Sequence, residues 1–333
     1  MSGDEAKKKK QRTPINWKVY NKQLKNRGKN LANCMKSLKA SNQEKEIQLM
    51  NNGKNGHPFE YTDTCVILLA ILKSVTGLGY VMTTGIATMF LDKVMSSTQL
   101  FRRVNALPEK LFESLNRRIT KSITKGKDEI DIILDGTGIM INGTFAWIDE
   151  KTGEKRARDW KKIHLVVERK SKAILVLEVI DKHKNEAENE SMKNTVLNAM
   201  DAIDENTQIK RAFGDGLYDS YDNFEMMDST GIELVARIRE PTINIAKSLL
   251  KSKVVSDKSL RRFKAFARNR AAIEQTDWKR YVREHNFGLR GGIEGIIGAF
   301  KRLFGEYAYA RSDESRAKEF LIKQMAWNVM RLG

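Results

Sequence analysis

The order of strand-like and helix-like segments after Lys127 constrains the fold of this 333-residue chain more than any other feature. Three β-rich runs come first, and helix-like and strand-like runs then alternate. The expected strands cover residues 130–141, 163–168, 173–180, 209–214 and 232–238, and the expected helices cover residues 187–203, 220–228 and most of the chain after Pro241. A strand meander followed by alternating helices and strands predicts an α/β fold with a mixed sheet.

A helical region, residues 59–125, precedes this segment. Its helix candidates are residues 61–74, residues 81–94 after a Gly77-Leu78-Gly79 break, and a short helix from an N-cap at Ser96 to Asn105. The last of these is expected to expose Gln99, Arg102 and Arg103. A short turn before a polar, basic helix is compatible with a helix-turn-helix DNA-binding domain. Any small core of three helices gives a similar pattern, so both interpretations stay open.

The chain is strongly basic, with 60 Lys and Arg against 42 Asp and Glu and a net charge of +18. This balance favours nucleic acid or an anionic membrane surface as partner. No apolar run approaches the ~18 residues of a membrane span, so we expect DNA and no membrane. Residues 1–55 hold 14 Lys and Arg against 4 Asp and Glu, a local charge of +10. We therefore expect residues 1–58 to form a basic arm, either a DNA-backbone arm or a solvated tail.

The start of the chain is polar and Lys-rich, without the apolar segment of a signal peptide. Its two cysteines, Cys34 and Cys65, are far apart and form no metal-ligand pattern. We therefore expect a reduced, cytoplasmic protein. With only 4 His in the chain, zinc chemistry is not expected. Any catalytic metal is expected to bind carboxylates, which suits Mg²⁺ or Mn²⁺.

Two aspartates are expected at strand ends, where glycines let the backbone bend. Asp135 precedes Gly136 and follows a β-like run that contains Ile130, Ile132, Ile133 and Leu134. Asp215 lies between Gly214 and Gly216. Carboxylates at the ends of neighbouring strands are well placed to point into one crevice. A single Asp-Gly pair is a common turn signal. Two such pairs that each close a strand of a basic protein favour a shared site.

A third acid lies on an expected helix over residues 286–305. Phe287, Arg290, Glu294 and Lys301 fall within an arc of about 60° at 100° per residue. The opposite side of this helix carries apolar residues that suit a core. The stripe is either part of a site or a solvated face with an Arg290–Glu294 ion pair.

The segment before this helix, residues 241–285, holds 12 Lys and Arg against 4 Asp and Glu. Interleaved aromatic and basic residues suit phosphate contact and base stacking, but they equally suit a helix with a buried aromatic stripe. The residues concerned are Phe263, Phe266, Trp278 and Tyr281, with Arg261, Arg262, Lys264, Arg268 and Arg280.

These motifs together resemble those of the DDE transposases of insertion sequences, which have an RNase H-like core. The resemblance covers roughly residues 59–331 and places the three acids 80 and 79 residues apart. It includes Asp135-Gly136-Thr137-Gly138, a Trp160-Lys161-Lys162-Ile163-His164 segment, Gly214-Asp215-Gly216-Leu217-Tyr218-Asp219-Ser220, and Phe287-x2-Arg290-x3-Glu294-x6-Lys301 followed by Arg302-Leu303-Phe304-Gly305. The family signature has Tyr at the position of Phe287, so the hydroxyl of that Tyr is absent here.

The resemblance implies an RNase H-like catalytic domain over residues 126–333 and a helical DNA-binding domain over residues 59–125. Asp135, Asp215 and Glu294 would hold two Mg²⁺ or Mn²⁺ ions for cleavage and strand transfer. Phosphate contacts are implied for Arg290 and Lys301, with possible help from Lys162 and His164. DNA contact is also expected at Phe287 and Arg302, and at Arg102 and Arg103 of the candidate helix-turn-helix. A structural role for His164 stays equally open.

The implied partners are the terminal inverted repeats of a mobile element and a target DNA. The protein is expected to act as a homodimer on paired ends, at the nucleoid of a prokaryotic cell. Two alternatives remain. The chain could be a stand-alone metal-dependent nuclease of the same fold. It could also be a non-catalytic DNA-binding regulator derived from a transposase, although the presence of all three acids argues against this.

Overall fold

The computed structural model describes most of the chain. The described residues are 16–41, 43–141, 147–148, 155–156, 160–180, 188–251 and 266–332. The Lys7–Arg12 cluster of the expected basic arm lies outside them, as do Phe263, Lys264, Arg261 and Arg262 of the basic segment.

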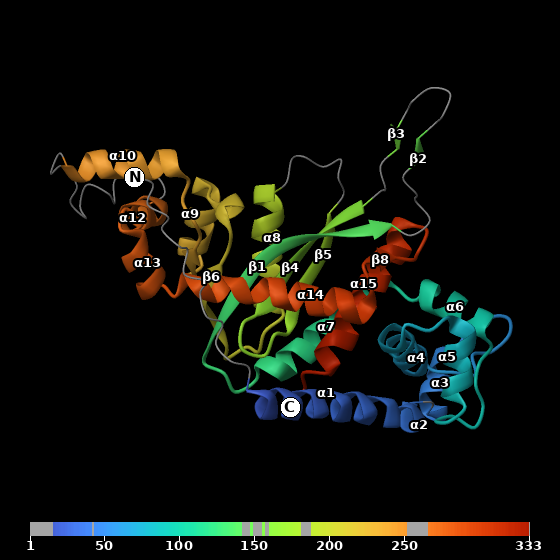
Figure 1. The fold of residues 1–333 in the computed structure, drawn as a ribbon. Coiled ribbons are helices and arrows are strands. Elements are labelled where there is room, and N and C mark those ends of the chain that lie inside the picture. Colours follow the sequence, from blue (N-terminus) through green and yellow to red (C-terminus); the bar gives the residue numbers. More distant parts are fainter. Residues whose placement is uncertain are drawn as a thin grey trace, which may run out of the picture.

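A mixed sheet in the order β5-β4-β1-β6-β7 forms the centre of the molecule (Figure 1). The central strand, β1, pairs antiparallel with β4 and parallel with β6, and its far end pairs with the short β8. The strands are β1 (Glu129–Ile141), β4 (Trp160–Glu168), β5 (Ile174–Ile180), β6 (Gln208–Phe213), β7 (Glu233–Val235) and β8 (Tyr307–Ala308), with a separate ribbon of β2 (Trp147–Ile148) and β3 (Lys155–Arg156). The predicted α/β fold with a mixed sheet is confirmed.

Helices cover both faces of this sheet, because side chains along β1 alternate between two buried cores. Ile133 and Ile139 belong to the core that α4, α7, α14 and α15 build. Ile132 and Leu134 belong to the opposite core, which α8, α9, α10 and α12 complete. These helices are α8 (Glu188–Asp201), α9 (Tyr221–Ser229), α10 (Glu240–Lys251), α12 (Phe266–Glu274), α14 (Gly292–Phe304) and α15 (Asp313–Val329), and α13 (Trp278–Glu284) precedes α14.

The N-terminal region is helical, as predicted. Its helices are α1 (Trp17–Lys36), α2 (Leu38–Ser41), α3 (Glu44–Asn51), α4 (Asp63–Thr76), α5 (Tyr80–Ala87), α6 (Ser97–Ala106) and α7 (Glu109–Thr124). Ser96 caps α6 by accepting a hydrogen bond from the backbone N–H of Gln99, and α4 ends at Gly77 with φ of 68°.

The prediction that the second helix extends to residue 94 is wrong. The α5 helix ends at Ala87, and the backbone N–H groups of Thr88, Met89 and Phe90 donate to carbonyls three residues back. Such bonds tighten the last turn and end the helix. No single described helix is long and apolar enough to span a membrane, and α4 and α5 reach that length only as a pair bent by 115°.

The helical region and the sheet share one hydrophobic core. The long α15 packs against both α4 and α7. Side chains also link the two regions, because Asn116 on α7 donates to the carbonyl of Leu321, and Lys318 donates to the carbonyl of Asn105. The boundary at residue 126 stays a prediction, since packing is continuous across it.

Candidate active site

Asp135 lies in the middle of β1, not at the end of a strand as the sequence suggested. Pairing with β4 runs past it as far as Met140. The strand on its other side does end here, because β6 pairs with β1 only up to the Ile133–Phe213 pair. That edge of β1 is next used at Met140, by β8. Asp135 therefore lies beside an opening in the sheet, where a carboxylate can point into a crevice.

Asp215 follows directly after β6, as predicted. Its Oδ1 accepts a hydrogen bond from the backbone N–H of Leu217 at 2.8 Å and caps a short 3₁₀ turn. Gly214 is required beside it. A Cβ at that position would lie 2.6 Å from Cδ2 of Tyr218, closer than unbonded carbon atoms approach. The ring of Tyr218 thus folds back over the glycine and holds the Asp215 loop compact.

The two aspartates line one cavity of about 110 Å³. Its other lining residues are Gly136, Lys162, His164, Leu217, Tyr218 and Asn223. Gly136 is paired with His164 across the strands and so faces the opposite side of the sheet from Asp135. Lys162 and His164, which pair with Gly138 and Gly136, therefore line the cavity from the opposite face of the sheet to Asp135. His164 is only 7% exposed.

Burial is the main influence on the pKa of Asp135, and neighbouring charges modify it. The pKa of its carboxyl group is raised, first by burial and then by the negative charges of Asp215 and Glu294. A hydrogen bond from the backbone N–H of Gly136 and the positive charge of Arg290 lower this pKa and partly offset the rise. Of these influences on the pKa of Asp135, the charge of Glu294 is the smallest, and its direction is the one expected if the three carboxylates share a site.

The predicted single helix over residues 286–305 is wrong at its start. Phe287–Gly291 form a 3₁₀ segment, and the α-helix begins at Gly292 after the Gly291 N-cap. Phe287, Arg290, Glu294 and Lys301 therefore do not lie on a single α-helix and form no continuous stripe. Phe287 packs edge-on against Trp278, with ring centroids 5.2 Å apart, and contacts the core rather than the site.

Arg290 forms an ion pair with Asp215 rather than with Glu294. Its Nη2 is 4.0 Å from Oδ2 of Asp215, and its Nε is buried without a hydrogen-bond partner. The alternative interpretation predicted an ion pair between Arg290 and Glu294 on the surface of one α-helix, and this ion pair does not form. Arg290 lies in the 3₁₀ segment, where the spacing of side chains differs from that of an α-helix. Glu294 and Arg302 are exposed, and Lys301 is half-buried in the last turns of α14.

The donor chemistry of the site suits a hard divalent cation. Carboxylate oxygens are the ligands that Mg²⁺ and Mn²⁺ prefer, and mutual repulsion of the three acids is what such an ion relieves. Within the described residues, no three His, Cys, Asp or Glu side chains already lie close enough to hold one ion. Asp135 and Asp215 line one cavity, but Glu294 on α14 does not line it and would have to approach the two aspartates for all three to share a metal.

Several expected DNA contacts are engaged within the protein instead. Arg103 is not on an exposed face, because its side chain is 12% exposed, pairs with Asp63 at 2.7 Å and donates to the carbonyl of Tyr61. Arg102 is exposed, as predicted. In the basic segment, Arg268 and Tyr281 are buried. The buried-core interpretation therefore holds for these two residues.

In the sequence, Asp219 was noted only as part of the motif around Asp215. In the structure it forms a buried ion pair. It is 4% exposed and accepts hydrogen bonds from Arg268 Nε at 2.6 Å and Nη2 at 3.0 Å, and from the backbone N–H of Arg239 at 2.8 Å. This buried ion pair fastens the loop that carries Asp215 onto α12. The one feature of the sequence that could have indicated this role is the position of Asp219 four residues after Asp215.

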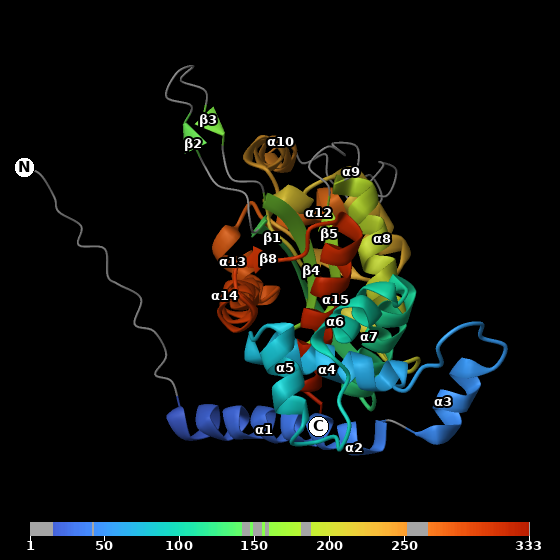
Figure 2. The same cartoon turned by 90° about the vertical axis from the view of Figure 1, so that its right-hand side faces the viewer.

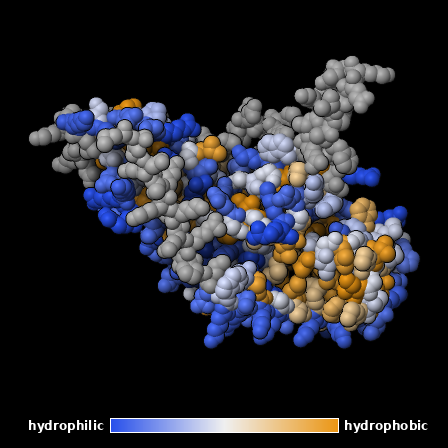
Figure 3. All heavy atoms as spheres, viewed as in Figure 1, coloured by the Kyte–Doolittle hydropathy of each residue, from blue (hydrophilic) through white to orange (hydrophobic). Residues whose placement is uncertain are grey.

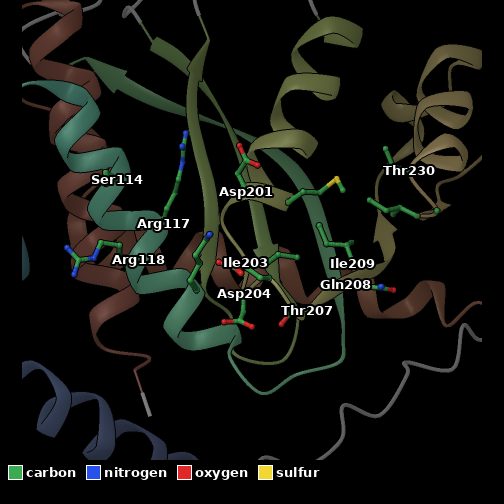
Figure 4. A pocket seen from close by; sticks show the side chains of 15 residues that line it. Ser114, Arg117, Arg118, Asp201, Ile203, Asp204, Thr207, Gln208, Ile209 and Thr230 are labelled. Carbon is green, nitrogen blue, oxygen red and sulfur yellow. The ribbon is translucent and has the colours of Figure 1, made fainter.

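A larger cavity of about 820 Å³ lies away from these acids, between α7 and the start of β6 (Figure 4). Arg117 and Arg118 line it from α7, and Asp204 and Thr207 from the loop before β6. Asp215 follows the other end of β6, about 20 Å away at 3.3 Å per residue. This cavity is therefore separate from the candidate active site.

A known protein family matches the part of the chain that contains these acids. The family described as "Transposase DDE domain" matches residues 126–329. The chain belongs to this family. The family match and the mixed sheet together confirm the predicted RNase H-like α/β core.

Solved structures show weaker likeness to this family member. A structure titled "Drosophila P element transposase strand transfer complex" has 10% identity and a TM-score of 0.30, over 64% of this chain and 49% of that chain. One titled "Mos1 transposase paired-end complex with left transposon end" has 10% identity and a TM-score of 0.23, over 69% and 81%. A simian T-cell lymphotropic virus intasome has 14% identity and a TM-score of 0.26, over 62% and 64%. The chain thus spans about half the length of the first.

Replacing Asp135 by Asn is expected to stabilise the fold in the absence of divalent ions. The pKa of Asp135 is raised in the folded state, so the ionised group costs stability once the pH rises through that pKa. Below the unfolded pKa this cost vanishes, and the two proteins should converge. We expect the Tm of Asp135→Asn to exceed the wild-type Tm by a few degrees at neutral pH, roughly 2–4 °C per kcal/mol. Thermal unfolding at neutral and acidic pH in EDTA measures this, and a lower Tm at neutral pH would contradict it.

Proposed function

We propose that this chain cleaves the ends of a mobile DNA element and joins them to a target DNA, with Asp135, Asp215 and Glu294 as the acids of its active site. One observation carries the proposal. Asp135 and Asp215 line the same cavity, Nη2 of Arg290 lies 4.0 Å from Oδ2 of Asp215, and the charge of Glu294 contributes to the raised pKa of Asp135. The family of transposase DDE domains provides the context for this arrangement.

The three carboxylates would hold Mg²⁺ or Mn²⁺, two ions in all. When bound, these ions stabilise negative charge on the attacking and leaving oxygens of a phosphodiester. The protein supplies the rest. The backbone N–H of Gly136 and the guanidinium of Arg290 limit the rise in the pKa of Asp135, and the N–H of Leu217 orients Asp215. Without these donors, a buried carboxylate would more readily bind a proton than a cation.

Cationic side chains around the cavity would hold the phosphates of the DNA strand. Arg290 presents donors beside Asp215, and Lys162 lines the cavity from the other face of the sheet. Lys301 and Arg302 lie about two turns further along α14 than Glu294. Arg can bind a phosphate with two parallel hydrogen bonds, whereas Lys acts as a point charge. His164 is buried beside Gly136 and would have a structural role, as part of the wall of the cavity.

The partners of this activity would be double-stranded DNA at the terminal inverted repeats and at the target. The exposed Arg102 on α6 belongs to the proposed end-binding surface, whereas Arg103 does not. Synapsis of two ends calls for a homodimer. The protein would act at the nucleoid of a prokaryotic cell.

The test is an assay with purified protein and duplexes that carry the inverted repeats flanking the gene. We expect cleavage at the repeat in Mg²⁺ or Mn²⁺, none in EDTA, and joining of pre-cleaved ends to a plasmid. Cleavage without joining would favour the stand-alone nuclease. Binding to the repeats without cleavage in either metal would favour the non-catalytic regulator.

Arg290→Ala and Lys301→Ala are expected to weaken binding of pre-cleaved ends and to slow strand transfer, each by about tenfold or more. A charged hydrogen bond to phosphate contributes about 1.5–3 kcal/mol, and each 1.4 kcal/mol is a factor of ten. End-binding titrations and single-turnover strand transfer measure the effect. Lys279→Ala, which lies on α13 away from the cavity, serves as a control. Wild-type behaviour of both alanine variants would remove these cations from the site.

A further inference from the structure

Helix α1 carries a ladder of lysines along one side. Its five lysines are Lys18, Lys22, Lys25, Lys29 and Lys36. At 100° per residue they fall within an arc of about 60°, and at 1.5 Å per residue they extend over about 27 Å. The helix contains neither Asp nor Glu. We call these five residues the lysine ladder.

The ladder faces solvent because the opposite side of α1 packs on the body of the protein along the last turns of the helix. Met35 is buried in the core, and Leu31 and Cys34 pack against it. The side chain of Asn30 also donates hydrogen bonds to the carbonyls of Met330 and Leu332. These contacts fix the rotation of the helix about its axis. All five ladder residues are exposed as a result.

The position of α1 leaves room for a long partner. The helix runs along one edge of the molecule, and its first turns project beyond the body (Figure 2). The same edge is lined by hydrophilic residues in the space-filling view (Figure 3). None of the five lysines forms an ion pair within the part of the chain that the structure describes. Their charge is therefore available to a partner.

We propose that the lysine ladder binds the phosphate backbone of duplex DNA without reading its sequence, as a second contact surface outside the active site. Charge complementarity selects the partner, because DNA carries one negative charge per about 1.7 Å of its axis. The ladder matches roughly eight base pairs in length at 3.4 Å each. Lysine suits this role, since it is a mobile point charge without the planar fork of Arg. Arg27 lies on the opposite side of the helix and is not part of the surface.

This inference rests on the proposed function for its partner, but its test is independent of catalysis. Binding of a short random-sequence duplex is titrated over a range of salt concentrations in EDTA, where no cleavage can occur. The ladder variant changes all five lysines to Gln, which keeps helix propensity. The matched control changes five exposed lysines on other elements to Gln, namely Lys45, Lys110, Lys125, Lys170 and Lys193.

The ladder variant is expected to bind the duplex on the order of 100-fold more weakly at low salt. Each phosphate contact contributes about 0.9 to the slope of log K against log salt, so this slope should become shallower by about 4 to 5. The control variant should change the slope by less than about 1. A third variant with five Lys→Arg changes keeps the charge and should bind like the wild type, which separates loss of charge from loss of fold.

Two results would overturn the proposal. Equal losses in the ladder variant and the control would mean that net charge alone governs binding. Unchanged duplex binding, with loss of binding to vesicles of phosphatidylserine and phosphatidylcholine, would assign the ladder to an anionic membrane surface. If the proposed transposition fails while the ladder variant alone loses duplex binding, the surface stands and only the catalytic assignment falls.

Discussion

Asp135→Asn, Asp215→Asn and Glu294→Gln are each expected to abolish DNA cleavage while duplex binding persists. The amide versions keep the size of each side chain and remove its charge. Asp135 and Asp215 share one cavity, and the charge of Glu294 contributes to the raised pKa of Asp135, so each change is expected to remove a proposed metal ligand. We expect rates to fall at least about 1,000-fold, equivalent to roughly 4 kcal/mol of transition-state stabilisation.

Measuring duplex binding distinguishes a variant that has lost its active site from one that has not folded. The basic surfaces lie outside the cavity, so the three variants should bind a random duplex as tightly as the wild type or slightly more tightly, because each loses one negative charge. Asp222→Asn and Glu225→Gln on the exposed side of α9 are matched controls and should cleave normally. A triad variant that cuts at a near wild-type rate in Mg²⁺ would exclude that residue from the site.

The role of the three acids can also be tested without DNA, by measuring how metal ions change the Tm. If the three acids hold the ions, Mg²⁺ or Mn²⁺ should raise the Tm of the wild type, since a ligand that binds only the folded state stabilises it. The increase should shrink in all three triad variants. It should persist in Asp222→Asn.

Much of the fold was predictable because strands and helices differ in the period of their apolar residues. The runs that became β4, β5 and β6 are bounded by turn residues or charged residues, and their limits matched closely. β1 was harder. Its run continues past Asp135 as far as Ile141, and only the pairing with its neighbours shows where the sheet opens. Which neighbouring strand ends beside a carboxylate is not encoded in the local pattern.

The candidate site shows the same limit. The Arg290–Glu294 spacing fits an ion pair on any α-helix, and nothing local predicts the 3₁₀ segment that directs Arg290 towards Asp215. The sequence also did not show which cationic side chains are exposed and which form ion pairs within the protein. Arg103 and Arg102 are neighbours on one helix, yet only Arg103 meets Asp63, 40 residues away in sequence. Partners so distant in sequence depend on packing, which composition and periodicity do not describe.

Arg268→Ala is expected to destabilise the fold strongly through the buried pair with Asp219. The side chains of Arg268 and Asp219 are 6% and 0% exposed, and their closest contact is 2.6 Å. Removing one partner leaves the other charge buried without compensation, which typically costs about 3–5 kcal/mol. At roughly 2–4 °C per kcal/mol, the Tm should fall by about 10 °C. The exposed Arg280→Ala, which breaks only a surface pair with Glu284, should leave the Tm unchanged.

The double variant Asp219→Ala/Arg268→Ala decides how this loss arises. If the cost of Arg268→Ala is the unpaired carboxylate, removing that carboxylate as well should recover part of the Tm, and the two changes should be far from additive. Additive losses would mean that the side chains contribute by packing alone. Because Asp219 also accepts a hydrogen bond from Arg239 and lies four residues after Asp215, the single variants should in addition lower cleavage below their unfolding temperature. A folded Arg268→Ala protein that cleaves at the wild-type rate would show that the Asp215 loop keeps its position without this pair.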